Sequence, residues 1–96
     1  LGTNPEELIA AAHAGCFNMK LSFVLNENGF SPETLETESV LTFVDGVVES
    51  IELSLSAKVP DISDEKFNEC AKEAKDNCPI SGLIKCKISL SSTLIQ

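Results

Sequence analysis

The hydrophobic positions near the start of the chain fall on nearly all sides of a helix rather than on a single stripe. Asn4 is a good N-cap, Pro5 suits the first helical position, and nothing interrupts the helix before Gly29, a typical residue just past a helix end. These boundaries predict a helix of about 24 residues, on the order of 36 Å long. Because a helix that is apolar all round is a buried one, we expect it at the centre of the fold. Its apolar residues are Leu8, Ile9, Ala10, Ala11, Ala12, Ala14, Cys16, Phe17, Met19, Leu21, Phe23, Val24 and Leu25.

An alternation of apolar and polar residues follows and predicts two strands, at roughly 35–44 and 47–59. Asp45-Gly46 lies between them and is typical of a two-residue hairpin, because a type I′ turn needs a positive φ at both positions. The second strand alternates cleanly, with its apolar residues on odd positions from Val47 onwards. We therefore expect these odd positions to face the core.

The two-residue turn also predicts the register of this hairpin. Counting away from the turn, Val40 lies opposite Ile51. This register places Leu41 and Phe43 on the other face of the sheet, so we expect that second face to be covered as well.

The second half of the chain predicts one amphipathic helix and one strand. Ser63 is a good N-cap, and the helix runs to about Asn77 before Pro79 ends it. A turn at 80–82 leads into a last strand at roughly 84–94. The order α-β-β-α-β predicts that the whole chain is a single α+β domain with a mostly antiparallel sheet. The apolar stripe of the helix is Phe67, Cys70, Ala71, Ala74 and Cys78, and the apolar side of the strand is Ile84, Cys86, Ile88, Leu90 and Leu94.

The long helix is more apolar than the remaining elements can cover. Three strands and a short helix can pack against one side of it, so its far side needs a partner subunit or further chain. The run from Ala10 to Gly15 has mostly small side chains, which let a second backbone come close. The simplest solution is an isologous homodimer that packs through residues 8–25.

Charge and composition argue against several classes of binding partner. Fifteen acidic residues against seven basic ones leave a net charge of −8, which argues against a nucleic-acid partner and against binding to an anionic membrane. Asn18, Lys20 and Ser22 interrupt the apolar helix, so we do not expect it to span a membrane. Four cysteines without a CxxC pair suit a cytoplasmic protein with one or two working thiols better than a secreted disulfide scaffold. No recognised metal-ligand spacing occurs.

The cysteines carry the candidate chemistry. Cys16 lies one helical turn after His13, whose imidazole can lower the pKa of the thiol, but a buried structural cysteine is the alternative. Cys78 lies at a helix end, where a thiol is accessible and mildly activated, or else it closes the apolar stripe of that helix. Cys70 and Cys86 lie on apolar faces, so we expect both in the core.

Glu6 has an ordinary explanation, because negative charge in the first turn of a helix stabilises the helix dipole. A catalytic role would need a partner cation. Glu6 precedes Cys16 by about 15 Å along the helix and cannot touch the sulfur of its own helix. An antiparallel second copy of the helix can bring Glu6 of one subunit towards Cys16 of the other.

Four segments and Phe67 closely resemble, in order along the whole chain, the osmotically inducible protein C (OsmC) and organic hydroperoxide resistance (Ohr) family. The segments are Thr3–Leu8, Ala11–Phe17, Val59–Ser63 and Asn77–Ser81. The Ala-His-Ala-Gly run of the second segment is more similar to the OsmC branch than to the Ohr branch. The two cysteine motifs together make the resemblance specific.

The resemblance implies that Cys16 is the peroxidatic cysteine, Cys78 the resolving cysteine and Glu6 the active-site glutamate. It implies a thiol peroxidase that reduces organic hydroperoxides and hydrogen peroxide through a Cys16–Cys78 disulfide. An external dithiol would recycle that disulfide, with no cofactor or metal. The resemblance also implies an intertwined homodimer with both active sites at the interface. His13 belongs to the family motif, but no catalytic step is assigned to it.

One feature departs from the family. The family has an N-terminal strand segment with an arginine that pairs with the glutamate and contacts the thiolate. This chain starts after that segment and contains no arginine, so the site is incomplete as it stands. The alternative function is therefore a non-catalytic dimeric scaffold or binding module with the same fold.

Overall fold

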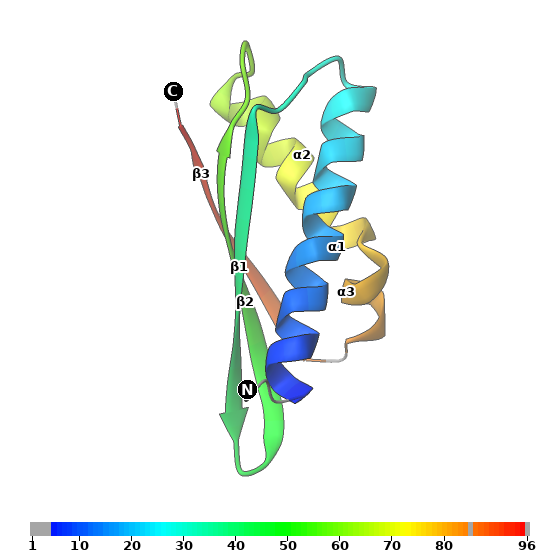
Figure 1. Cartoon of the computed structure of the whole chain (residues 1–96), viewed down its shortest axis with the longest axis vertical. Helices are drawn as coiled ribbons and strands as arrows, with labels where there is room; N and C mark the ends of the chain where they lie inside the picture. Colours follow the sequence, from blue (N-terminus) through cyan, green and yellow to red (C-terminus); the bar gives the residue numbers. More distant parts are fainter. Residues whose placement is uncertain (1–4, 85, 96) are drawn as a thin grey trace.

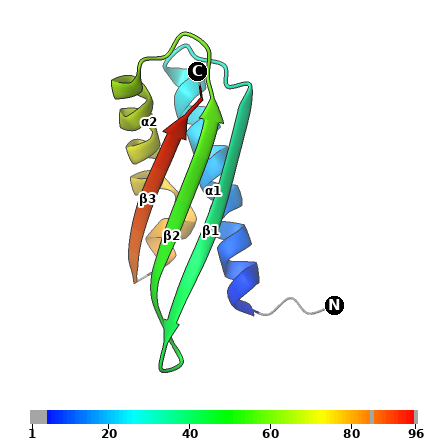
Figure 2. The ribbon, with the colours of Figure 1, turned by 90° about the vertical axis from the view of Figure 1, so that its left-hand side faces the viewer.

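One layer of helices covers one face of a three-stranded sheet with the strand order β1-β2-β3 (Figures 1 and 2). The structure is a computed structural model that describes residues 5–84 and 86–95, so the expected N-cap Asn4 lies outside the described residues. The α+β class predicted from the sequence is confirmed. The elements are α1 (Pro5–Glu27), β1 (Thr34–Val44), β2 (Val47–Lys58), α2 (Asp64–Asn77), α3 (Pro79–Leu83) and β3 (Lys87–Leu94).

The end of α1 follows from its glycine. Gly29 has a φ of +88°, and the amide of Phe30 donates to the carbonyl of Leu25 over 2.9 Å. The amide of Gly29 donates to the carbonyl of Asn26 over 3.1 Å, which completes a Schellman motif. The predicted C-terminal boundary of the long helix is therefore confirmed.

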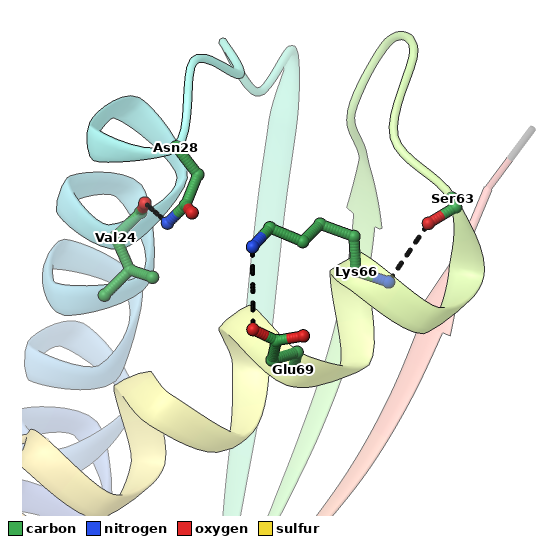
Figure 3. A network of polar contacts seen from close by, with 5 residues as sticks. All are labelled: Val24, Asn28, Ser63, Lys66 and Glu69. Carbon is green, nitrogen blue, oxygen red and sulfur yellow. Dashed lines mark hydrogen bonds and ion pairs between the residues drawn. The ribbon is translucent and has the colours of Figure 1, made fainter.

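The start of α2 is also set by local hydrogen bonds (Figure 3). The Ser63 hydroxyl accepts a hydrogen bond from the amide of Lys66 over 3.1 Å, as expected of an N-cap. Nζ of Lys66 pairs with Oε1 of Glu69 on the same helix at 3.5 Å.

Figure 3 also shows a side-chain hydrogen bond at the end of α1, where the side-chain amide of Asn28 donates to the carbonyl of Val24 over 2.8 Å.

The β1–β2 hairpin has the predicted turn but not the predicted register. Asp45 and Gly46 have φ values of 53° and 78°, as a type I′ turn requires. A β-bulge then shifts the pairing, because β2 contains one extra residue, Glu49, next to the turn. Leu41 therefore lies opposite Ile51, and the predicted Val40–Ile51 pairing is wrong.

The bulge also changes which side chains face the core. Leu41 shares the inner face with Ile51 rather than lying on the other face. Val47, which alternation placed on the buried side, is 64% exposed. Beyond the bulge the predicted alternation of β2 holds, since its odd positions are buried: Ile51, Leu53, Leu55 and Ala57.

β3 runs parallel to β2, so the sheet is mixed, with one antiparallel and one parallel pairing. The helical crossover through α2 and α3 returns the chain to the end of the sheet where β2 begins, and the next strand must then run in the same direction. Pro79 ends α2 as predicted, but it also begins α3, where the sequence predicted a turn. A proline suits the first position of a helix, which explains why α3 starts there.

The core lies between the sheet and the helices. Phe17 and Leu21 of α1 and Phe67 of α2 are at most 1% exposed. The apolar stripe predicted for α2 is buried in full, from Phe67 to Cys78. By length and composition α1 could also cross a membrane, but its buried residues pack into this core.

The opposite side of α1 is open. Leu8, Met19 and Phe23 are 62%, 76% and 54% exposed. The long helix is therefore buried on one side only in the single chain, and an apolar surface remains on its far side.

Candidate functional site

Two cysteines from distant parts of the chain meet beside α1. The Sγ atoms of Cys16 and Cys78 lie 2.8 Å apart, and both residues are free thiols. Cys16 lies in the middle of α1 and is half-buried, whereas Cys78 is only 2% exposed. The structure thus brings together the two cysteines of the sequence motifs, although Cys78 is less accessible than expected for a helix end.

The first turn of α3 surrounds the sulfurs with donors. Cys78 is the N-cap of α3, where backbone N–H groups have no partner within the helix. The N–H of Ile80 acts to lower the pKa of both thiols, and the N–H and hydroxyl of Ser81 act to lower the pKa of Cys78. This turn therefore stabilises negative charge on the cysteine pair.

The pKa values of the two thiols are shifted in opposite directions. Burial raises the pKa of Cys16, and the hydrogen bond with Cys78 raises it further, while the N–H of Ile80 and the charge of Lys20 oppose this. Burial also acts to raise the pKa of Cys78, but the hydrogen bonds from Cys16, Ser81 and Ile80 outweigh it and lower that pKa. Of the two thiols, Cys78 therefore has the lower pKa.

Of the two alternatives that the sequence left open, His13 does not lower the pKa of Cys16, and it is a buried, hydrogen-bonded residue. Its Nε2 lies 2.7 Å from the Ser81 hydroxyl, and the residue is fully buried. Burial lowers the pKa of His13 below its ordinary value of 6.5, so the ring is neutral near pH 7. The pKa of Cys16 is raised rather than lowered, and the ring reaches the cysteine pair through Ser81 instead.

An apolar cleft of about 630 Å³ opens onto Cys16. Lys20 supplies its positive charge, and the Lys20 ammonium lies 5.2 Å from the centre of the Phe23 ring. The lining residues are Ala12, Gly15, Cys16, Met19, Lys20, Phe23, Pro79 and Ile80. A small apolar or amphipathic molecule can therefore reach the Cys16 sulfur.

Two contributors to this site were missed at the sequence level. Lys20 lies four residues after Cys16, on the same face of the helix, and that spacing was a usable signal. Ser81 lies three residues after Cys78, but only the helical fold of the segment after Pro79 makes its donors converge on the sulfur.

The other candidates lie elsewhere. α1 is continuous, so Glu6 remains about 15 Å along the helix from Cys16 and the chain does not bring the two together. Cys70 is buried in the core as expected. Cys86 is only half-buried and lines a smaller apolar cavity. Within residues 5–84 and 86–95, no three His, Cys, Asp or Glu side chains form a metal-binding cluster.

Comparison with known proteins places these features in a family. Residues 1–93 match the family model described as OsmC-like protein. The chain is 41% identical over 97 residues to Peroxiredoxin OsmC of Escherichia coli, an alignment that covers 97% of this chain and 68% of that protein. It is 33% identical over 84 residues to Organic hydroperoxide resistance protein-like 1 of Staphylococcus saprophyticus, covering 83% of this chain and 60% of that protein. The chain therefore spans roughly two-thirds or less of these two relatives.

Solved structures share the fold. The organic hydroperoxide resistance protein OhrB of Bacillus subtilis superposes with a TM-score of 0.73 at 29% identity, covering 99% of this chain and 72% of that one. An OsmC-like protein from Mycoplasma pneumoniae superposes with a TM-score of 0.91 at 15% identity, covering 100% and 74%.

Proposed function

Because the chain belongs to the OsmC-like protein family, we propose that it is a cysteine-based thiol peroxidase that reduces organic hydroperoxides and hydrogen peroxide. The observation that carries this proposal is the 2.8 Å contact between the sulfurs of Cys16 and Cys78 beside an apolar cleft. The names of the relatives, a peroxiredoxin and organic hydroperoxide resistance proteins, support the same reaction class.

In the first step Cys16 is the nucleophile, since it lines the cleft. The shared proton moves to Cys78, which frees the Cys16 thiolate to attack the terminal peroxide oxygen. The O–O bond breaks, and the departing alkoxide takes up a proton and leaves as an alcohol, or as water from hydrogen peroxide. Cys16 is oxidised to a sulfenic acid.

In the second step Cys78 attacks the sulfur of the Cys16 sulfenic acid. The S–O bond breaks, the hydroxide takes up a proton to leave as water, and a Cys16–Cys78 disulfide forms. A disulfide bond is about 2.05 Å long, so sulfurs already in contact need little movement. An external dithiol then reduces the disulfide by exchange.

The cleft favours organic peroxides. Most of its lining side chains are apolar, so burial of the alkyl group of an organic peroxide there contributes favourable binding free energy. The peroxide group can then contact Cys16, which lines the same cleft. The cycle uses only thiols, a peroxide and a dithiol. Because it depends on reduced thiols, it suits the cytoplasm.

The open side of α1 supports an obligate homodimer that packs through residues 8–25. Exposed Leu8, Met19 and Phe23 would be buried in that interface, as surfaces of this kind usually are. An antiparallel arrangement of the two helices would bring Glu6 of the partner subunit towards Cys16. We propose that Glu6 is a catalytic residue in that position.

A non-catalytic dimeric scaffold is the second candidate function. It is favoured by the raised pKa of Cys16. A peroxide-consumption assay with a dithiol separates the two functions. It should be run on this chain and on a version preceded by the family's N-terminal segment. We expect turnover in the extended version. A lack of turnover with several peroxides, together with an unreactive Cys16, would instead favour the scaffold.

A further inference from the structure

A buried histidine has no step in the proposed reaction, yet it contacts the residue that contacts the thiol pair. His13 is 0% exposed, and its Nε2 lies 2.7 Å from the Ser81 hydroxyl, 68 residues away in the sequence. Its other ring nitrogen, Nδ1, is buried without a hydrogen-bond partner among the residues that the structure describes.

The unpartnered nitrogen identifies the tautomer. A neutral imidazole carries one proton, and a buried N–H without an acceptor costs more than a buried lone pair without a donor. The proton is therefore on Nε2, and His13 donates to the oxygen of Ser81. The hydroxyl proton of Ser81 is then free to donate elsewhere.

The acceptor that we assign to this proton is the sulfur of Cys78. Ser81 lies one turn after Cys78 in α3, where hydrogen bonding from its hydroxyl acts to lower the pKa of the Cys78 thiol, and the Cys16 sulfur lies 2.8 Å from the Cys78 sulfur. The hydrogen bonds therefore run in one direction, from His13 through Ser81 to Cys78. A chain of donors that ends on one sulfur stabilises negative charge there.

We propose that Ser81 is a further catalytic residue and His13 its positioning residue. Together they hold Cys78 as the thiolate that resolves the sulfenic acid and as the leaving group when the disulfide is reduced. This proposal rests on the thiol chemistry of the proposed function. It specifies which sulfur is attacked and which one leaves when the disulfide is reduced. The thiolate of the external dithiol attacks the Cys16 sulfur, the S–S bond breaks, and Cys78 departs with the electron pair. The second thiol of the dithiol then attacks the mixed disulfide and releases Cys16, so the dithiol is oxidised and the protein disulfide is reduced.

Thiolate absorbance near 240 nm tests the first half of the proposal. The full chain is titrated in a Cys70→Ala and Cys86→Ser background, so that only the reactive pair contributes. We expect Ser81→Ala to lower the thiolate fraction at pH 7 about threefold to tenfold, since a hydrogen bond to a charged sulfur is lost. Ser81→Thr keeps the hydroxyl and should restore most of the fraction. Ser54→Ala, on the exposed face of β2, is the matched control and should have no effect.

The rate at which dithiothreitol opens the preformed disulfide tests the second half. A poorer leaving group slows exchange, so Ser81→Ala and His13→Leu should both slow opening by about threefold to tenfold. His13→Gln retains an N–H donor and should open at close to the wild-type rate, and Ser81→Ala alone tests the slowing if His13→Leu fails to fold.

If Ser81→Ala lowers the melting temperature but leaves thiolate fraction and opening rate unchanged, the hydrogen bond only ties α1 to α3 and the proposal is wrong. Neither assay contains a peroxide. A chain without peroxidase activity would therefore be recognised separately, by the consumption assay.

Discussion

The sulfur of Cys16 lies 2.8 Å from the sulfur of Cys78, although 62 residues separate the two cysteines in the chain. Both are held by their neighbours, because Phe17 beside Cys16 and Ala74 one turn before Cys78 are 0% exposed. Rotation of either helix to separate the sulfurs would pull one of these side chains out of the core. The contact is therefore a property of the packed fold, and it motivates the first prediction.

One equivalent of an organic hydroperoxide should convert Cys16 and Cys78 into a disulfide and leave Cys70 reduced in the core. Peptide mapping by mass spectrometry measures this directly. Cys78→Ser should stop the reaction at the sulfenic acid, which excess peroxide then over-oxidises, and Cys16→Ser should abolish peroxide consumption. A Cys70–Cys86 link, or an over-oxidised Cys16 beside an untouched Cys78, would show that the resolving cysteine is misassigned.

The exposed face of α1 predicts a dimer. Sedimentation at micromolar concentration should show a dimer, and Met19→Glu combined with Phe23→Glu should abolish it, because buried unpaired charges destabilise an apolar interface. Val47→Glu changes an apolar residue of similar exposure on the hairpin and should leave the dimer intact. A well-folded wild-type monomer would contradict the prediction.

Phe67 is expected to be a major source of stability. It is 1% exposed between α2 and the sheet, so Phe67→Ala should lower the free energy of unfolding by about 3–5 kcal/mol. Leu83 is 77% exposed, and Leu83→Ala should change it by no more than about 0.5 kcal/mol. Urea denaturation followed by circular dichroism measures both, and equal losses would argue against the described core.

The turn between β1 and β2 should depend on its glycine. Gly46 has a φ of +78°, a conformation that costs a residue with a Cβ about 1–2 kcal/mol. Gly46→Ala should destabilise the chain by this amount in thermal or urea unfolding. Gly82→Ala is the control, because Gly82 has no positive φ and no atom within 4 Å of an added Cβ.

His13 should make stability depend on pH. Burial lowers its pKa below the value of 6.5 that it has in the unfolded chain, so below pH 6.5 the unfolded state binds the proton more readily. Stability should therefore fall as the pH drops from 6.5 towards the folded pKa, by at most about 1.4 kcal/mol per pH unit for this one proton. Urea unfolding at pH 7.5, 6.5 and 5.5 measures the slope. His13→Gln should remove it, and an unchanged slope would assign the effect to other groups.

Local elements of the fold could be predicted from the sequence because their causes act over a few residues. The hairpin turn needs the positive φ that Asp45 and Gly46 adopt. The hydroxyl of Ser63 caps the start of α2, and Gly29 allows the backbone turn that ends α1. The apolar stripe of α2 follows equally from a 3.6-residue period. The candidate cysteines were likewise identified by their motifs.

Tertiary packing decided the rest. The bulge at Glu49 depends on the fit between β1 and β2 and the core, so counting from the turn alone predicted the wrong partner for Ile51. The parallel pairing of β3 depends on the crossover through α2 and α3, which no short pattern encodes. The sequence left open whether His13 acts on Cys16 one turn away or is a hydrogen-bonded structural residue, and its ring contacts Ser81 because α3 folds against α1 and offers a partly buried hydroxyl there. Sequence thus determines which groups are available and where each local element starts and ends. Contacts between residues far apart in the chain decide which groups meet, since they arise only when the faces of several elements pack together.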